Sequence, residues 1–249
     1  MSGHSKWHSI KHKKGAADAK RGKLFAVLIR QIEIAARSGG GDPASNATLR
    51  SMIQKARDNS LPVDTIQRAV KRGTGEEAGV IYEQVSYEGY AASGVAVIVQ
   101  ALSDNRNRTS AEIKNLFSRN GGSFAEPGAV SWQFERKGIV DVDRGVDEDE
   151  LLLVAADAGA EDVKDGGDTW QVTTPPTDLH AVRTAIEQAG YKVKAGDLTM
   201  IPTTVVELTK ESQAKTVLHL MDVLEDHDDT EAVYANFDIP DAVLEAVTA

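Results

Sequence analysis

Residues 138–201 read GIVDVDRGVDEDELLLVAADAGAEDVKDGGDTWQVTTPPTDLHAVRTAIEQAGYKVKAGDLTMI, a stretch that alternates short strand patterns with amphipathic helix patterns. A strand is predicted over 139–142, followed by a helix over 147–158 whose acidic first turn suits the positive end of the helix dipole. The remaining elements are strands at 162–164 and 169–173, a helix at 176–189 and a strand within 191–201. This β-α-β-β-α-β order is that of a ferredoxin-like domain.

The segments on either side of this stretch give the same order again. Before it come a nearly continuous apolar strand at 95–102 (VAVIVQAL), a helix from about 110 to 119 and a strand at 130–134. After it come a strand at 203–208, a helix at 211–225 and a strand at 232–237. We therefore expect a second α+β domain, residues 80–134 plus 203–240, with the third domain, 138–201, inserted into it. The strand at 80–87 would be an extra strand of the host sheet. A single large mixed sheet is the alternative.

Residues 24–75 are predicted to form an all-helical domain. The predicted fold class is therefore α+β, with an N-terminal helical domain followed by two ferredoxin-like α+β domains. Apolar residues at helical spacing predict one helix over 24–37 and another from the Asp42-Pro43 pair to about Asn59. Pro62 opens a third helix, for which Gly73 is the expected C-terminal cap.

Residues 1–23 form a predicted basic arm of opposite charge to the rest of the chain. The whole protein has a formal net charge of −10, yet this arm holds seven Lys and Arg residues and one acid, Asp18. Cationic side chains displace counterions from phosphates, and an indole stacks on exposed bases. The arm candidates for nucleic-acid contact are Lys6, Trp7, His8, Lys11, His12, Lys13, Lys14, Lys20, Arg21 and Lys23. The alternative is a solvated terminus whose charges only aid solubility.

The histidines of the arm, His4, His8 and His12, recur every four residues and would share one side of a helix. Metal binding is not expected, because no carboxylate or thiolate completes the set and the surrounding cations repel a divalent ion. We expect these side chains to add to contacts with phosphates or bases.

A second candidate contact is the motif Asp104-Asn105-Arg106-Asn107-Arg108-Thr109, at the passage from a strand to a helix. Free backbone N–H groups there, with Arg106, Asn107 and Arg108, suit phosphates and base edges. The alternative is a structural turn in which Asn or Asp caps the helix. The acidic run at 225–229 is interpreted as a solvated loop, because it lacks the ligand spacing of a calcium loop.

Composition excludes several classes of protein. The chain has no cysteine, no long apolar run of membrane-span length and no apolar core of a secretory signal. It carries no G-x-S-x-G, H-E-x-x-H or P-loop motif. We therefore expect a cytoplasmic, non-enzymatic protein without cofactor, metal, membrane or small-molecule substrate.

The opening GHSKWHSIKHKKGAADAKRGKLF, residues 3–25, closely resembles the start of the YebC/PmpR family of transcriptional regulators. Further matching segments are PVDTIQRAVKRGTG (62–75), YEGYAASGVAVIV (87–99), SDNRNRT (103–109) and VYANFDI (233–239). The resemblance implies three domains, with the third inserted into the second, and a cytoplasmic nucleic-acid-binding protein. It implies contact residues Lys6, Trp7, Lys11, Lys13, Lys14, Arg21 and Lys23, with Arg106, Asn107 and Arg108 as secondary candidates.

Two functions remain open at this point. The first is a DNA-binding transcriptional regulator that acts through the arm. The second, implied by related mitochondrial translational activators, is a factor bound to the ribosome or to ribosomal or messenger RNA. Both use cations on phosphates, and RNA additionally offers unpaired bases for Trp7.

Overall fold

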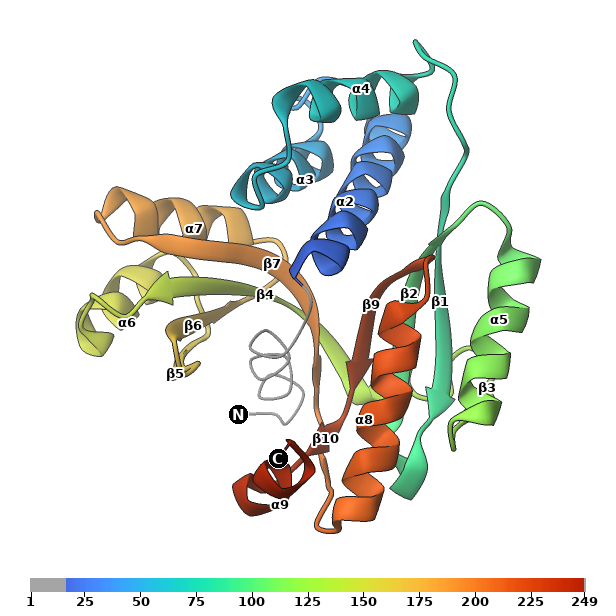
Figure 1. Ribbon diagram of the computed structural model, residues 1–249. Helices are drawn as coiled ribbons and strands as arrows, with labels where there is room; N and C mark the ends of the chain where they lie inside the picture. The colour runs from blue at the N-terminus through green and yellow to red at the C-terminus, as the bar shows by residue number, and fades with distance from the viewer. Residues whose placement is uncertain (1–16, 249) are drawn as a thin grey trace.

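The protein consists of a helical unit and two α+β units (Figure 1). The computed structural model describes residues 17–248, with the side chains of residues 21–247. The helical unit, at the top of Figure 1, contains α2 (Ala17–Gly39), α3 (Ala47–Asp58) and α4 (Val63–Thr74). The prediction of an α+β fold with an N-terminal helical part is confirmed. The residue boundaries of the three predicted domains remain predictions.

Helix α2 begins earlier than the sequence pattern indicated. Residues 17–23 carry no apolar stripe, but Ala, Lys and Arg are strong helix formers, and the helix extends back to Ala17. The end of the predicted arm, with Lys20, Arg21 and Lys23, is therefore helical. The core of the unit is built from apolar residues of all three helices, among them Leu28, Ile32, Leu49, Ile53 and Ile66.

Two predicted helix boundaries are wrong. The N-cap of α3 is the buried Asn46, whose side chain accepts a hydrogen bond from Leu49 N, while Asp42 closes the turn before it. The C-cap of α4 is Gly75, which has a φ of 84°, and not Gly73. Gly73 lies inside the helix, where a Cβ atom would come within 2.6 Å of the Glu33 carbonyl oxygen. Its role is close packing of α4 on α2.

The third unit has the predicted ferredoxin-like topology. Its antiparallel sheet has the order β5-β6-β4-β7. The strands are β4 (Phe134–Asp143), β5 (Asp162–Asp165), β6 (Thr169–Thr174) and β7 (Val193–Pro202). The helices α6 (Glu148–Asp157) and α7 (Leu179–Gln188) enclose a core with the strands. Asp147 caps α6, which explains the acidic helix start in the sequence.

The sheet of the second unit has the same spatial arrangement of strands as a ferredoxin-like sheet, but the strands follow each other in a different order along the chain. Its sheet runs β3-β1-β2-β9, all neighbours antiparallel, with β1 (Glu83–Tyr90), β2 (Ala96–Ser103), β3 (Ser123–Ala125) and β9 (Thr230–Ala235). The prediction that the strand near 80–87 is an extra one is wrong, because β1 lies inside the sheet and takes the place of the third ferredoxin strand. The helices α5 (Arg106–Arg119) and α8 (Glu211–Asp226) pack on the same face of the sheet.

The predicted strands at 130–134 and 203–208 do not belong to this sheet. Residues 131–133 form a short 3-10 turn, held because the buried Glu88 carboxylate accepts hydrogen bonds from the backbone N–H groups of Gly128, Val130 and Ser131. The short β8 (Val206–Glu207) pairs with β10 (Phe237–Asp238) in a separate two-stranded sheet, and α9 (Asp241–Thr248) follows.

The long strands β4 and β7 join the two α+β units. They pair from Phe134 with Pro202 to Val142 with Val193. At their base, Val130 and Phe134 pack against Ala96 and Ile98 on the face of the second unit's sheet opposite α5 and α8. Within the described part of the chain, none of the helices has the length and apolarity needed to cross a bilayer.

Candidate nucleic-acid interface

Most of the predicted arm candidates lie outside the residues that the structure describes. These are Lys6, Trp7, His8, Lys11, His12, Lys13 and Lys14. Lys20 is placed in α2 by its backbone. Arg21 is exposed on the same helix, with its guanidinium carbon 5.3 Å from the centre of the Phe25 ring, a cation–π contact.

Lys23 reaches from α2 to the C-terminal end of α8. Its Nζ atom donates to the carbonyl oxygen of His227 at 2.6 Å and to that of Glu225. The last carbonyls of a helix lack partners within the helix and carry the negative end of its dipole. Since α8 has no basic residue in its own last turn, Lys23 supplies the cation from a different unit.

The motif at 104–109 is the start of α5. Asn105 is the N-cap, and its side chain accepts a hydrogen bond from Arg108 N at 3.2 Å. Ser103 Oγ accepts from Asn105 N at 2.9 Å and lies 2.7 Å from Thr109 Oγ1. The structural role considered for this motif, a turn that caps a helix, is therefore present.

Arg108 is held by carboxylates of this protein. Its Nη2 atom donates to Asp229 Oδ2 at 2.6 Å and lies 3.0 Å from Asp104 Oδ1. Asp229 is buried and also accepts from Thr109 Oγ1 at 2.6 Å. Burial alone would raise the pKa of Asp229, but these hydrogen bonds and the charge of Arg108 outweigh it and hold the pKa below its ordinary value.

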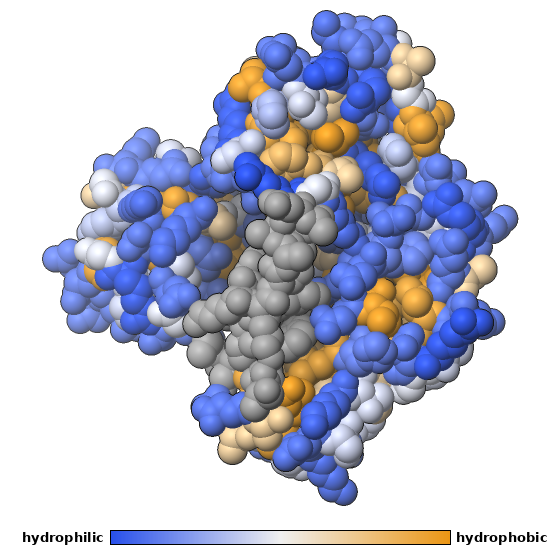
Figure 2. Space-filling view, in the orientation of Figure 1, coloured by the Kyte–Doolittle hydropathy of each residue, from blue (hydrophilic) through white to orange (hydrophobic). Residues whose placement is uncertain are grey.

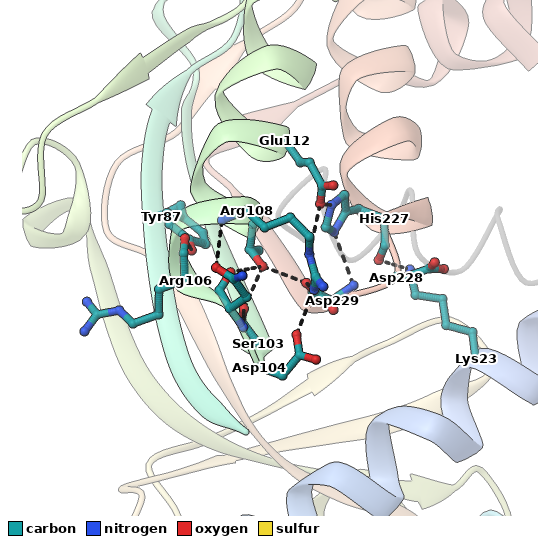
Figure 3. A network of polar contacts seen from close by, with 12 residues as sticks. Lys23, Tyr87, Ser103, Asp104, Arg106, Arg108, Glu112, His227, Asp228 and Asp229 are labelled. Atoms are coloured by element: carbon teal, nitrogen blue, oxygen red, sulfur yellow. Dashed lines mark hydrogen bonds and ion pairs between the residues drawn. The ribbon is translucent and has the colours of Figure 1, made fainter. Parts of the chain in front are cut away.

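The three candidates of the motif therefore differ in availability. Figure 3 shows Arg108 directed at Asp229, whereas Arg106 points away from the network. The side chain of Arg106 is 67% exposed, and its one ion pair with a described residue is a long one, 3.9 Å, with Glu83. Asn107 is exposed as well. Arg106 and Asn107 are thus accessible to a phosphate, while Arg108 would have to leave a partner.

The acidic run at 225–229 is not the solvated loop that we expected. His227 Nδ1 accepts from Asp229 N at 3.2 Å, which leaves Nε2 to face Glu112 Oε2 at 3.0 Å. Arg30 of α2 donates to the carbonyl oxygen of Asp228 at 2.9 Å, and its guanidinium lies 5.0 Å from the centre of the Tyr82 ring. Arg30 was not a predicted site residue, because its hydrogen-bond partner Asp228 is 198 residues away.

These groups line an open cavity of about 630 Å³ between α2, the start of α5 and the end of α8. Arg30 and Arg108 form ion pairs with acids of this lining, so the cavity presents a polar junction between units. The lining residues are Arg30, Tyr82, Asp104, Arg108, Glu112, Asp226, His227, Asp228 and Asp229.

Outside this junction, the helical unit presents exposed basic side chains. They lie on all three helices and have no carboxylate within ion-pair distance among the described residues. These residues are Arg37, Arg50, Arg57, Arg68 and Lys71.

Comparison with known proteins identifies the family. Residues 82–237 match a family profile described as "TACO1/YebC second and third domain", and residues 5–76 match one described as "TACO1/YebC protein N-terminal domain". The chain belongs to the TACO1/YebC family. The resemblance of the opening motif to YebC/PmpR proteins is thereby confirmed.

Relatives of this TACO1/YebC protein match it over its full length. A protein of Halothermothrix orenii named "Probable transcriptional regulatory protein" is 53% identical and covers 100% of this chain and 99% of its own length. A protein of Thermobifida fusca with the same name is 52% identical and covers 100% of both chains. The crystal structure of a conserved hypothetical protein from Aquifex aeolicus, 44% identical, matches with a TM-score of 0.84 over 93% of this chain and 96% of that chain.

Proposed function

We propose that this TACO1/YebC protein is a cytoplasmic, non-enzymatic regulator that binds DNA through its basic N-terminal arm. The observation that carries the proposal is the division of charge along the chain. Residues 1–75 hold 15 Lys and Arg against 5 Asp and Glu, and residues 76–249 hold 13 against 33. A molecule built this way approaches a polyanion with one end and is repelled elsewhere. The names of the relatives support a regulatory role.

In this proposal, Lys6, Lys11, Lys13 and Lys14 neutralise phosphates, and Trp7, His8 and His12 contact bases or add to phosphate contacts. Arg21 and the exposed basic residues of the helical unit extend the same surface beyond the arm. Arg106 and Asn107, accessible at the start of α5, form a second and smaller contact. Such a surface fixes the protein on a nucleic acid by charge and carries little sequence information.

A second candidate is a translation factor that binds ribosomal or messenger RNA, and possible partners then include the ribosome. The interleaving of Trp7 with lysines favours it, because single-stranded RNA offers unpaired bases for stacking. Contact through the arm would also let the protein reach RNA cavities that exclude its folded units.

The arm is tested by replacing Lys11, Lys13 and Lys14 with Ala and measuring affinity for a DNA duplex across a range of salt concentrations. We expect weaker binding and a salt slope flatter by about two to three units, because up to three phosphate contacts are lost. The matched control replaces the exposed Lys164, Lys192 and Lys194 of the third unit. An unchanged slope in the arm variant, or an equal loss in the control, rejects the arm as the contact.

Two measurements separate the candidates. A promoter-specific regulator should prefer its site over random DNA by about a thousandfold or more. A translation factor should sediment with ribosomes in a DNase-treated lysate, and its arm-deleted variant should not. Sedimentation with ribosomes without any preferred DNA site selects the second candidate.

A further inference from the structure

The helical unit is attached to the rest of the protein almost entirely by polar contacts. Its apolar core contains residues of α2, α3, α4 and their connections, and none of the other three apolar clusters includes a residue of this unit. The chain leaves it through residues 75–81, which are exposed. Units joined in this way move relative to each other unless a large apolar interface prevents it.

Two groups of contacts hold the unit in place. In the first, Lys23 and Arg30 of α2 donate to carbonyl oxygens of residues 225–228, and Gln31 donates to Glu231. In the second, α3 meets the third unit through ion pairs. Lys55 Nζ lies 2.9 Å from Asp197 Oδ1, and Arg183 Nη1 lies 2.8 Å from Asp58 Oδ2. Figure 2 shows a mainly hydrophilic surface where the helical unit approaches the second unit.

The first group places protein oxygens where phosphate oxygens would bind. Residues 225–231 contain five acids and no Lys or Arg. Lys23 and Arg30 lie seven residues apart, hence on one face of α2, and the exposed Arg37 continues this face. In the docked arrangement Lys23 and Arg30, the first two basic residues of this face, are therefore bound to oxygens of the protein itself.

The junction also contains polar atoms that lack partners. Among the described residues, the buried Gln31 Oε1 and Thr230 Oγ1 make no hydrogen bond. A buried polar atom without a hydrogen-bond partner lowers the stability of the interface that contains it. These two atoms therefore contribute less to docking than hydrogen-bonded groups in the same places would.

We propose that residues 225–231 act as an internal phosphate mimic that holds the basic face of α2, and that the helical unit undocks when nucleic acid takes this face. Lys23 and Arg30 then become nucleic-acid contacts in the undocked state, and docking lowers the apparent affinity by the fraction of molecules that are closed. The proposal rests on the nucleic-acid-binding function proposed above.

The test weakens docking without changing net charge or any basic residue of α2. The double variant Arg183→Gln/Asp197→Asn removes one cation and one anion of the third unit and breaks both ion pairs with α3. Because the three helices share one core and move together, losing the α3 ion pairs shifts the whole unit toward the undocked state, although the α2 contacts themselves are unchanged. The control variant Asp162→Asn/Lys164→Gln removes an ion pair of the same unit, 2.7 Å long, that does not touch the helical unit.

Two readouts are taken on each variant. Since the chain has no cysteine, Ser51→Cys in α3 and Gln188→Cys in α7 place spin labels on exposed sites of the two units. We expect a longer and broader label distance in the Arg183→Gln/Asp197→Asn variant, and in the wild type once duplex DNA is added. We also expect the affinity of the Arg183→Gln/Asp197→Asn variant for that duplex to be about threefold or more above the wild-type value at low salt. The control variant should bind with the wild-type affinity.

The remaining outcomes reject either the docking inference alone or the proposed function together with it. A longer label distance with unchanged affinity overturns the inference and leaves the proposed function standing. An unchanged label distance in the double variant also overturns it. Absence of nucleic-acid binding by the wild type and by both variants rejects the proposed function, and the inference with it. If the double variant does not fold, Lys55→Gln/Asp58→Asn breaks the same two ion pairs from the α3 side, again without a change of net charge.

Discussion

Arg108 Nη2 lies 2.6 Å from Asp229 Oδ2, although 121 residues separate the two in the chain. The contact joins the first turn of α5 to the segment between α8 and β9. Arg30 of the helical unit approaches the other oxygen of the same carboxylate, with its Nη1 atom 3.7 Å from Asp229 Oδ1. A single buried carboxylate thus connects the second unit to α2.

Replacing Asp229 by Asn should lower the free energy of unfolding by about 1–3 kcal/mol, because an amide brings its own donors to face Arg108 and Thr109. Urea unfolding at neutral pH measures the change. The matched control is Asp228→Asn, since the Asp228 side chain is exposed and its carbonyl oxygen, which accepts from Arg30, is kept. The control should stay within about 0.5 kcal/mol of the wild type. Equal stability of the two variants would contradict the buried role of Asp229.

The lowered pKa of Glu88 leads us to expect that the protein loses stability in acid. Burial alone would raise its pKa, but three backbone N–H donors at 128, 130 and 131 outweigh burial and lower the pKa below the value of 4.5 in an unfolded chain. A lowered pKa means that the stabilisation is present above about pH 4.5 and is lost as the pH falls through the lower pKa of the folded state.

The Glu88→Gln variant should therefore be less stable than the wild type at pH 7, and the difference should shrink as the pH falls below about 4.5. Urea midpoints between pH 7 and acid measure it. Glu126→Gln removes an exposed carboxyl from the loop that Glu88 binds; it serves as the control and should follow the wild type at every pH. A constant difference between Glu88→Gln and the wild type over the whole range would refute the assignment.

Two glycines of the helical unit should respond in opposite directions to the same substitution. Gly73→Ala should destabilise by about 1–3 kcal/mol, because the new methyl group would meet the Glu33 carbonyl oxygen and the Ala36 Cβ atom, each at 2.6 Å. Gly22→Ala should stabilise by about 0.5–1 kcal/mol, because this helical glycine has no described atom within 4 Å of an added Cβ. Thermal unfolding of both variants provides the measurement. A more stable Gly73→Ala variant would contradict the close packing of Gly73 against α2.

The sequence predicted the third unit well because its elements carry local signals. Each strand and helix there shows its own periodicity, and turn residues separate them. The second unit was harder, since Val130–Phe134 reads as a strand by composition, whereas the Glu88 carboxylate, more than 40 residues earlier in sequence, bends residues 131–133 into a turn. The order of strands in its sheet depends on which distant strands pair. The sequence of β1 has the same strand pattern whether β1 is an added strand or lies between β3 and β2.

In the candidate site, too, features with a local sequence signal could be predicted and contacts between distant residues could not. The accessible position of Arg106 agrees with a role in binding, but the partners of Lys23 and Arg108 could not be predicted. They are the end of α8 and Asp229, which lie 204 and 121 residues away. An acidic run at 225–229 gives no signal in the sequence that one of its carboxylates, Asp229, is buried.

The pairing of β2 with β9 has a consequence for the order in which the protein folds. Val97 is the partner of Ala235 in this pair, and all strands of the third unit lie between them in the chain. On the ribosome, the third unit is complete before α8 and β9 have been synthesised. Until then β2 has an unpaired edge, and its apolar residues Val97 and Val99 lack the cover of α8. Such an edge invites pairing with other chains. Closure of the second core therefore has to wait until β9 has been synthesised, and β2 needs protection until then.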